Sequence, residues 1–399
     1  MEERCRSPLE VHFAGLTLAS PCIVASSVLT GDMIRIGKAA AAGAGGVSTK
    51  MAMVGESRQS HPDVIVRPGT GGIVSAGDRR LSLDEARALV RRARRETDLT
   101  IIANLLAPAA DEMAWQRGAV GLQEAGAQAV ELDLSCPNLP GRSSARSVAQ
   151  SPVDSGRVTR AVKSAVNVPV LCKLTAQVAD IAEVARVCEL SGADAVVVIN
   201  GFPAAPEIDI RKGGRPTYLT SSGHSFGTLT GSPLFPIACR AVADVSRAVS
   251  IPVLGCGGIS SWEEAVQMMM WGASAVQICS SILVRGFSVL DKINEGISAF
   301  MNEAGYGSPA DFVGAALQYV VPAESIVRRR VELSVIDEKC TRCGLCLMPG
   351  ICLALSESPE GISIDTKRCL NCGVCIRLCP NRAITPSDAV EASIQPHRT

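Results

Sequence analysis

Eight of the sixteen cysteines of this 399-residue chain lie close together near its C-terminus. They form two runs in which two-residue spacers separate three cysteines, and a fourth cysteine follows each run. Such runs are typical of metal ligands, because short spacers let neighbouring sulfurs converge on one centre. The first run comprises Cys340, Cys343, Cys346 and Cys352, and the second comprises Cys369, Cys372, Cys375 and Cys379.

The spacing favours iron–sulfur clusters over zinc, because zinc ribbons use pairs of Cys-x2-Cys rather than two triplets. In bacterial-type ferredoxins with two clusters, the fourth cysteine of each run ligates the other cluster. The spacer of five residues before Cys352 departs from the usual three. We predict two crossed [4Fe–4S] sites, one held by Cys340, Cys343, Cys346 and Cys379 and the other by Cys369, Cys372, Cys375 and Cys352.

The long segment before these cysteines alternates short apolar runs with helical stretches such as SLDEARALVRRARRE and DIAEVARVCELSG. Most runs are continuously apolar, as strands of a parallel sheet buried on both faces should be. Eight strand–helix units predict an α/β chain with a (β/α)8 barrel, also called a TIM barrel, rather than an open doubly wound sheet. The runs begin at Cys22, Gly45, Thr100, Ala129, Val168, Asp194, Ile251 and Ser274.

We expect four parts along the chain. A barrel spans residues 1–305, a linker spans 306–330, and a small two-cluster ferredoxin domain spans 331–385, with a tail at 386–399. Hydrophobic residues make up 47% of the chain, which is enough for a sizeable core. The length suits one large domain and one small one.

Charge and composition exclude several classes of function. The 39 basic and 39 acidic residues cancel, so no long-range field draws the chain to nucleic acid or to an anionic membrane. The opening residues MEERCRSPLE lack the apolar core of a signal peptide, so we expect a cytoplasmic protein with reduced thiols. The uncharged stretch 266–284 is interrupted by Trp271, Gly272 and Gln277. We therefore expect a buried helix and strand there, not a membrane span.

Two connections within the predicted barrel are long, 51–81 and 201–232. Both are rich in glycine, serine and proline, and both follow the carboxyl end of a strand. The active site of a barrel lies at this end, and long loops in compact domains are usually functional. We therefore expect both loops near the site. His224, in the second loop, is either a polar contact or simply solvated.

The turns after the seventh and eighth strands predict a phosphate site. They read GCGG from Gly255 and CSS from Cys279. Barrels bind phosphate with backbone N–H groups and hydroxyls at these two turns. Lysine is scarce, with eight in the chain, yet Lys50 and Lys173 both fall at strand ends facing the expected site. A cation there suits a flavin, because it stabilises the anionic reduced ring.

Cys136 follows the fourth strand within the segment DLSCPN. A cysteine at such a strand end is a proton donor, a nucleophile or inert filler. Filler is a real alternative, since five other barrel cysteines lie in apolar runs or helices. Cys136 differs because Ser135, Pro137 and Asn138 surround it with polar and turn-forming groups.

Five segments together resemble the dihydroorotate dehydrogenase family. With the cysteine-rich domain behind them, the likeness is greatest to the flavin–iron–sulfur part of dihydropyrimidine dehydrogenases. The resemblance spans nearly the whole chain. The segments are ELDLSCPN from Glu131, KLT from Lys173, VIN ending at Asn200, GTLTGSPLFPIA from Gly227 and GCGGI from Gly255.

The resemblance implies roles for individual residues. Cys136 would be the general acid or base, on the side of the substrate away from the flavin. The neighbouring substrate contacts would be Asp133, Ser135, Asn138 and Asn200. The residues that would hold FMN are Ala25, Ser26, Lys50, Asn104, Lys173, Gly231, Gly257, Gly258 and Ser280.

The chain departs from the family at the substrate. Asp133 stands where the family has asparagine, Gly201 stands where the pyrimidine enzymes have a hydroxyl residue, and residues 51–81 contain no asparagine. Three functions therefore stay open. One is dihydropyrimidine or dihydroorotate oxidoreduction, the second is reduction of another conjugated lactam, amide or enoyl compound, and the third is electron transfer as a subunit of a flavoprotein complex.

The sequence contains no strand–GxGxxG–helix fingerprint for FAD or NAD(P). Electrons must therefore be exchanged with a partner, which we expect to be an NAD(P)H-dependent flavoprotein subunit or a ferredoxin. We also expect a small-molecule substrate, a homo- or hetero-oligomer, and no nucleic acid or membrane partner.

Overall fold

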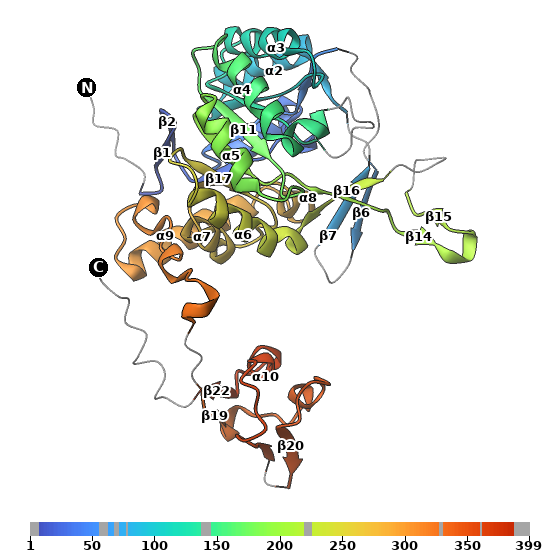
Figure 1. Cartoon of the computed structure of the whole chain (residues 1–399), viewed down its shortest axis with the longest axis vertical. Helices are drawn as coiled ribbons and strands as arrows, with labels where there is room; N and C mark the ends of the chain where they lie inside the picture. Colours follow the sequence, from blue (N-terminus) through green and yellow to red (C-terminus); the bar gives the residue numbers. More distant parts are fainter. Residues whose placement is uncertain are drawn as a thin grey trace. The chain divides into compact units, whose positions relative to one another are not determined.

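The computed structural model describes residues 8–55, 63–67, 72–76, 79–136, 145–218, 226–326, 330–359 and 361–386. Backbone contacts divide the chain into two compact units, 1–320 and 321–399 (Figure 1). The boundary between them falls inside the segment 306–330, which the sequence analysis assigns to a linker.

The larger unit is a closed parallel barrel, as predicted. Its strands pair in the order β3-β4-β9-β10-β11-β12-β17-β18, and β18 pairs back onto β3. Almost every strand residue is buried, because the barrel interior covers one face and helices cover the other. All eight predicted strands are present: β3 (Cys22–Val24), β4 (Gly46–Ser48), β9 (Thr100–Leu106), β10 (Ala129–Asp133), β11 (Val170–Leu174), β12 (Ala195–Val198), β17 (Val253–Cys256) and β18 (Ala273–Ile278).

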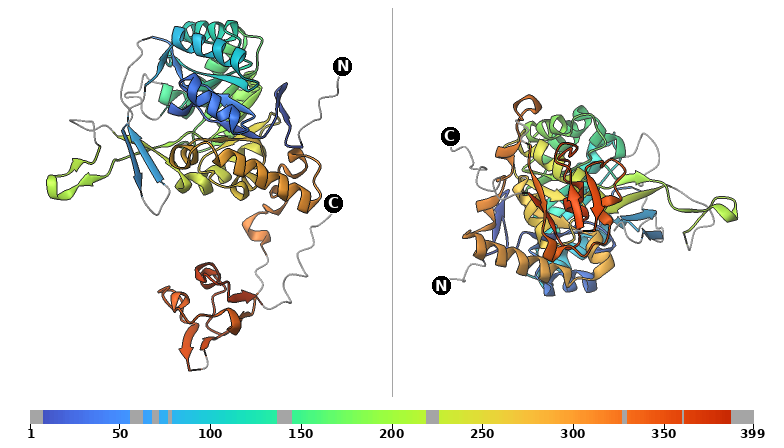
Figure 2. Two further views of the ribbon diagram at one scale, coloured as in Figure 1. Left: turned by 180° about the vertical axis from the view of Figure 1, so that it is seen from behind. Right: turned by 90° about the horizontal axis from the view of Figure 1, so that it is seen from below.

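Helices cover the outside of the barrel (Figures 1 and 2). In the second of them, the buried residues Ala86, Leu89, Val90 and Ala93 recur at helical spacing and face the strands. This helix begins with a capping box, in which the Ser82 side chain accepts from the backbone N–H of Glu85 and the Glu85 side chain accepts from the backbone N–H of Ser82. The helices are α1 (Met33–Ala41), α2 (Leu83–Glu96), α3 (Glu112–Glu124), α4 (Pro152–Lys163), α5 (Ile181–Leu190), α6 (Phe235–Ser246), α7 (Trp262–Met270), α8 (Ser280–Arg285) and α9 (Val289–Ala304).

The uncharged stretch 266–284 contains the second half of α7, then β18 and all but the last residue of α8. The predicted helix and strand are therefore confirmed. In the described part of the chain, no helix combines the length and apolar character that a membrane crossing requires.

An antiparallel hairpin closes one end of the barrel. It consists of β1 (Val11–Phe13) and β2 (Leu16–Leu18), whose residues alternate between buried and exposed. The buried side chains pack against Ile23, Ile102 and Leu171 of the barrel strands. An active site must therefore lie at the opposite end, where the strands have their carboxyl ends.

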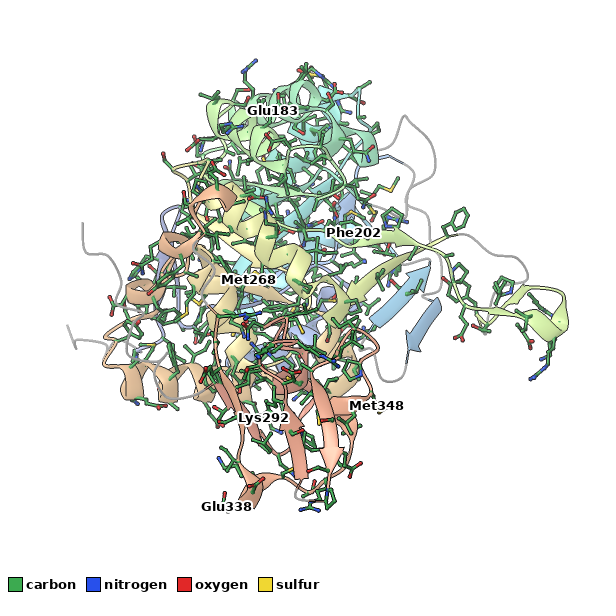
Figure 3. All side chains as sticks on the ribbon, turned by 60° about the horizontal axis from the view of Figure 1, so that its bottom comes forward. Glu183, Phe202, Met268, Lys292, Glu338 and Met348 are labelled. Carbon is green, nitrogen blue, oxygen red and sulfur yellow. The ribbon has the colours of Figure 1, made fainter. Side chains whose placement is uncertain are left out.

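The two long connections pair with each other, which the sequence analysis does not predict. The first contributes β6 (Asp63–Arg67) and β7 (Gly72–Ala76), and the second contributes β13 (Phe202–Ala204) and β16 (Gly227–Gly231). They form one antiparallel sheet in the order β13-β16-β7-β6. Phe202, labelled in Figure 3, lies where the second connection leaves the barrel. The sheet fixes both connections beside the carboxyl ends of the strands.

Smaller strands complete these connections. β5 (Ala52–Met53) and β8 (Leu81–Ser82) extend the barrel sheet beside β9. β14 (Ile208–Asp209) and β15 (Arg215–Pro216) form a hairpin within the second connection. His224, the histidine of that connection, lies outside the described residues.

Residues 306–320 differ from the predicted linker. Phe312 is fully buried and contacts Phe300 and Tyr306 with its ring. The backbone N–H groups of Gly314 and Ala316 donate to carbonyls at the end of α7. Apolar and backbone contacts therefore hold this segment on the barrel, and the second unit begins after it.

The smaller unit has two short antiparallel pairs and one helix. β19 (Leu333–Val335) pairs with β22 (Ile384–Pro386), and β20 (Leu355–Ser358) pairs with β21 (Gly361–Ile364). The helix is α10 (Val374–Leu378). The hydrophobic core of the smaller unit has four buried residues among those described, and two of them, Cys346 and Cys375, are cysteines. A core this small commonly needs a metal centre to be stable.

Candidate active site and cysteine-lined cavities

The carboxyl ends of the barrel strands bring together most of the site residues proposed from the sequence. Lys50 follows β4, Asn104 lies on β9, Asp133 ends β10 and Lys173 lies on β11, and all four are buried. Buried polar side chains need hydrogen-bond partners, because an unpaired buried charge is costly. The partners of these residues therefore show what the site is built to hold.

Glu131 is the centre of a buried hydrogen-bond network. One of its carboxylate oxygens accepts from Asn104 Nδ2 at 2.7 Å and from Lys173 Nζ at 3.5 Å. The other oxygen accepts from Gln277 Nε2, and Gln277 Oε1 accepts from Lys173 Nζ at 2.9 Å. The network joins four barrel strands and holds Asn104 and Lys173 in place.

Neither Glu131 nor Gln277 is among the site residues predicted from the sequence. Both are fully buried polar residues inside apolar strands. A polar or charged residue inside an apolar strand could have indicated a buried network from the sequence, because charged residues are almost never buried without a partner.

Lys173 stays charged in this network. Burial alone lowers the pKa of its ammonium, but the opposite charge of Glu131, with smaller contributions that include Cys256 and Asp133, raises the pKa above its usual value. The barrel therefore carries a permanent buried cation at the place where the sequence predicts one beside a flavin.

Asp133 lies at the end of β10 and accepts from Asn200 Nδ2 at 2.9 Å and from the backbone N–H of Ser135 at 3.3 Å. Burial raises the pKa of its carboxyl, while the charge of Lys173 lowers it. The carboxyl thus holds the Asn200 amide. Two lysines at neighbouring strand ends, Lys50 and Lys173, are candidate ion-pair partners of Asp133. Among the described residues, no ion pair joins Asp133 to either of them.

Cys136 is 7% exposed and follows directly after this strand end. Arg80, which the sequence analysis does not propose, donates from Nη2 to Cys136 Sγ at 3.7 Å. The hydroxyl of Ser135 is buried and has no hydrogen-bond partner among the described residues. Asn138 lies outside the described residues, so its predicted role stays a prediction.

The turns predicted to bind phosphate require glycine. Gly257 and Gly258 have φ angles of +136° and +78°, and a Cβ on Gly258 would lie 2.6 Å from the backbone nitrogen of Phe235. Gly231 ends β16 with a φ of +90°. These conformations are open to glycine and strained for other residues. The backbone conformation therefore explains why glycine occupies these three positions.

The remaining proposed residues lie at two neighbouring strand ends. Ala25 and Ser26 follow β3, where the N–H of Ala25 donates to Ile278 O at 2.9 Å. Ser280 begins α8 directly after β18. The hydroxyl of the adjacent Ser281 is buried without a partner among the described residues.

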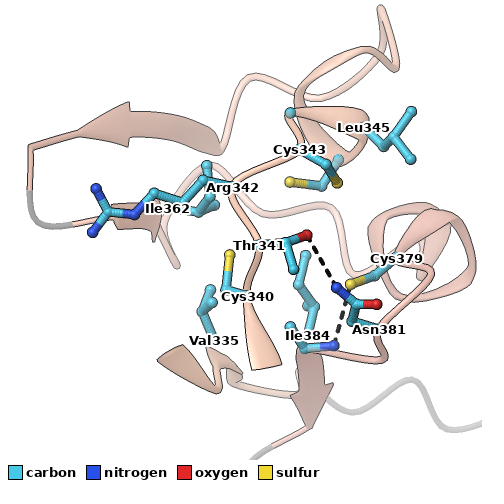
Figure 4. Close-up of a pocket in the computed structure, with 13 residues that line it drawn as sticks. Val335, Cys340, Thr341, Arg342, Cys343, Leu345, Ile362, Cys379, Asn381 and Ile384 are labelled. Carbon is cyan, nitrogen blue, oxygen red and sulfur yellow. Dashed lines mark hydrogen bonds between the residues drawn. The ribbon is translucent and has the colours of Figure 1, made fainter. Parts of the chain in front are cut away.

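Two cavities in the smaller unit are lined by cysteines. The first is lined by Cys340, Cys343, Cys346 and Cys379 (Figure 4). The second is lined by Cys352, Cys369, Cys372 and Cys375. These are the same two groups as in the crossed assignment. In the described residues, no three His, Cys, Asp or Glu side chains converge closely enough to hold a single metal ion.

Backbone N–H groups point at the cysteine sulfurs. Ala383 N donates to Cys379 Sγ at 3.2 Å, and Asn371 N donates to Cys369 Sγ at 3.4 Å. The first of these bonds is the main reason why the pKa of Cys379 lies below that of an ordinary thiol. Hydrogen bonds to the sulfurs are one of the means by which proteins tune iron–sulfur clusters.

A closed barrel with a buried polar site, followed by a cysteine-rich unit, is the arrangement of flavin-dependent oxidoreductases that act on a CH–CH group and carry an iron–sulfur domain, and the matches to known families place this chain among them. The chain belongs to the dihydroorotate dehydrogenase family, whose sequence model matches residues 8–301. A second family model, the 4Fe-4S binding domain, matches residues 362–385. The resemblance found in the sequence is therefore confirmed.

Known relatives agree with this classification. The chain is 36% identical over 314 residues to the catalytic subunit of dihydroorotate dehydrogenase B (NAD(+)) of Pyrococcus abyssi, covering 78% of this chain and 99% of that protein. It is 29% identical over 349 residues to the NAD-dependent dihydropyrimidine dehydrogenase subunit PreA of Escherichia coli, covering 85% and 84%. The crystal structure of a dihydroorotate dehydrogenase of Eimeria tenella has the same fold, with a TM-score of 0.65, 19% identity and coverage of 79% and 90%.

The family implies FMN, and the residues present fit it. Asn104 lies fully buried on β9 with its Oδ1 atom lacking a partner among the described residues, although its Nδ2 atom is held by Glu131. An orphaned buried acceptor of this kind is rare in a native protein and indicates a missing donor. The permanent cation at Lys173 adds the charge that a reduced flavin ring requires.

Proposed function

We propose that the chain interconverts a dihydropyrimidine-like compound and its unsaturated form, with Cys136 as the group that gains or loses the proton. The observation that carries this proposal is the position of the thiol. Cys136 is buried at the strand ends, next to the pair formed by Asp133 and Asn200 and to the cation Arg80. An acid–base group must lie within hydrogen-bond reach of the reacting carbon, and these neighbours form a polar site around it.

The chain's own residues divide the work in this proposal. Asp133 orients the amide of Asn200 toward the substrate, and Ser135 and Asn138 add further polar contacts. Cys136 moves a proton to or from one carbon of the substrate at Sγ. FMN, when bound, supplies or accepts the hydride at the neighbouring carbon. The residues that would hold it are Ala25, Ser26, Lys50, Asn104, Lys173, Gly231, Gly257, Gly258 and Ser280.

We propose further that the two cysteine-lined cavities hold two [4Fe–4S] clusters, which supply one-electron transfer between the flavin and an external partner. The grouping of the cysteines around two separate cavities supports this assignment. A partner is needed because the chain lacks a dinucleotide fingerprint. We propose an NAD(P)H-dependent flavoprotein subunit or a ferredoxin in this role, within a cytoplasmic oligomer.

A second function is favoured by one observation. In this chain the carboxyl of Asp133 already engages Asn200, and Gly201 supplies no hydroxyl. When Asp133 is ionised, its carboxylate accepts hydrogen bonds and does not donate them, so a substrate carbonyl at this point would face another acceptor. The alternative is reduction of a different conjugated lactam, amide or enoyl compound that offers an N–H to Asp133.

The experiment that separates these functions is an anaerobic activity screen. The purified holoprotein is supplied with a chemical electron donor or acceptor and tested with uracil, thymine, dihydroorotate and related lactams. Turnover of a pyrimidine supports the first function, and turnover of another lactam alone supports the second. Flavin and cluster reduction without turnover of any compound would favour the electron-transfer subunit instead.

We expect one FMN and eight irons per chain. The prediction follows from one flavin site and eight cysteines around two cavities. Anaerobically purified protein is analysed for flavin, iron, sulfide and zinc. The matched variants Cys379→Ala and Cys352→Ala should each lose about half of the iron, because each removes one ligand of a different cluster. Four irons in the unmodified protein, or bound zinc, would contradict the two-cluster assignment.

We expect Asp133→Asn to improve the use of simple pyrimidines. An asparagine keeps an oxygen that can accept from Asn200 and adds an N–H that can donate to a substrate carbonyl. Two opposed acceptors in a buried site cost about 1–3 kcal/mol, so kcat/KM for uracil or thymine should rise by about 5- to 100-fold. Steady-state assays of both proteins measure the change. Efficient reduction of uracil or thymine by the unmodified protein, with no gain in the variant, would contradict this prediction and support a simple pyrimidine as the substrate.

A further inference from the structure

Arg80 is a buried cation with an unusual environment. The residue lies directly before β8 and is 6% exposed. Among the described residues, its side chain forms one hydrogen bond, to Cys136 Sγ at 3.7 Å, and its Nε atom is buried without a partner. Buried guanidinium groups are normally paired with a carboxylate, because an uncompensated buried charge is costly. The sulfur is therefore the group best placed to balance this charge.

The neighbouring charges do not take over that role. Lys173 and Glu131 are paired with each other at 3.5 Å. Burial raises the pKa of Asp133, and the charge of Arg80 is among the smaller effects that lower it. Its carboxyl is engaged by Asn200 and by a backbone N–H, and among the described residues it forms no ion pair with Arg80. Among the described residues, the charges that act on Asp133 at the end of β10 are those of Lys173, Glu131 and Arg80, and of these Arg80 donates a hydrogen bond to the thiol.

The segment that carries Arg80 is held by main-chain bonds. Leu81 N donates to Met51 O at 3.0 Å, and β8 pairs with β5 at the edge of the barrel sheet. The neighbouring Arg79 instead points to solvent and pairs with Glu85 of α2. Two adjacent arginines therefore have opposite environments, and the backbone presents Arg80 to the site.

We propose that Arg80 is a positioning residue for the proton transfer, which stabilises the thiolate form of Cys136 so that the sulfur acts as a base at neutral pH. This inference rests on the proposed function of Cys136. In the oxidative direction, the proton of a substrate C–H bond moves to Sγ, and its electron pair becomes the new C=C bond. The hydride leaves from the adjacent carbon to the flavin of the family, so that charge and electrons balance. A neighbouring cation favours thiolate over thiol.

The test measures the ionisation of Cys136 without relying on turnover. The FMN-loaded protein is treated with iodoacetamide across a range of pH, and alkylation of the peptide that contains Cys136 is quantified by mass spectrometry. In Arg80→Gln, the pH of half-maximal alkylation should rise by about one to three units, the usual effect of a charge within this distance. The alkylation rate at pH 7 should fall at least about tenfold, while the plateau rate at high pH, which reports access, stays the same.

Two matched variants make the result specific. Arg80→Lys keeps the positive charge and should stay close to the unmodified protein, and Arg79→Gln removes an exposed neighbouring arginine and should change nothing. Cys239, a buried cysteine on α6 away from Arg80, is the internal reference in each digest. The pH profile of dehydrogenation should move upward in Arg80→Gln by the same amount as the alkylation profile.

An alkylation profile in Arg80→Gln that matches the unmodified protein would overturn the proposal. If the variant also binds a carboxylate-bearing pyrimidine more weakly, Arg80 would be assigned to the substrate instead. The alkylation shift does not depend on whether Cys136 is essential. A shift found together with full activity of Cys136→Ala would therefore refute the proposed function of Cys136 and leave the pairing with Arg80 in place.

Discussion

Replacing Cys136 with alanine should lower turnover by about 10²–10⁴, the usual contribution of a positioned acid or base. The thiol is buried at the strand ends beside Asp133 and within reach of Arg80. Alanine cannot exchange a proton, but it removes little volume and leaves the Glu131 network, formed by Asn104, Lys173 and Gln277, in place. FMN should therefore stay bound. Anaerobic turnover, flavin content and flavin reduction by dithionite measure the two effects separately.

A matched control shows whether the loss belongs to this cysteine. Cys239 on α6 is as deeply buried as Cys136, at 8% and 7% exposure, and lies in an apolar helix face. Cys239→Ala should keep nearly normal turnover. Near-normal turnover of Cys136→Ala as well would show that Cys136 is a filler cysteine like the others in the barrel.

Replacing Glu131 with glutamine should destabilise the barrel by about 3–5 kcal/mol, the usual cost of removing one partner of a buried ion pair. Glu131 is fully buried and accepts hydrogen bonds from Asn104, Lys173 and Gln277. Glutamine has nearly the same shape but no charge, so the ammonium of Lys173 would lose its counter-charge. The free energy of unfolding in denaturant measures the loss.

The same variant should also bind FMN more weakly, because Glu131 holds Asn104 and Lys173 at the proposed flavin site. Flavin content after purification and after addition of excess FMN reports this effect. Glu303→Gln, at the exposed end of α9, removes the same charge and should leave stability and flavin content unchanged. An unfolding free energy in Glu131→Gln equal to that of Glu303→Gln would show that the network does not support the site.

The barrel and the cysteine-rich unit follow from local patterns in the sequence. Most of the eight strands are predominantly apolar runs, because both faces of the barrel sheet are buried. Helices such as α2 have apolar residues at helical spacing, because one face of the helix packs on the strands. The uncharged stretch 266–284 is correctly divided into helix and strand for the same reason. The family follows from short segments such as GCGGI from Gly255 and ELDLSCPN from Glu131.

The partners within the site could not be predicted in this way. Glu131 and Gln277 are 146 positions apart, and Arg80 and Cys136 are 56 positions apart. No local pattern relates such residues, because their contact depends on the closure of the barrel and on the register between its strands. The same holds for the pairing of β7 with β16, which joins two connections that read separately as loops.

The sequence was sufficient to identify which residue types stand at the strand ends, since a parallel barrel places every carboxyl end at one face. It was not sufficient to determine what each side chain does there. Asp133 is an acceptor for Asn200, and Arg80 faces a thiol although Arg79 faces solvent. These outcomes depend on distances of a few ångströms between distant segments, and burial makes the energy of each charge sensitive to those distances.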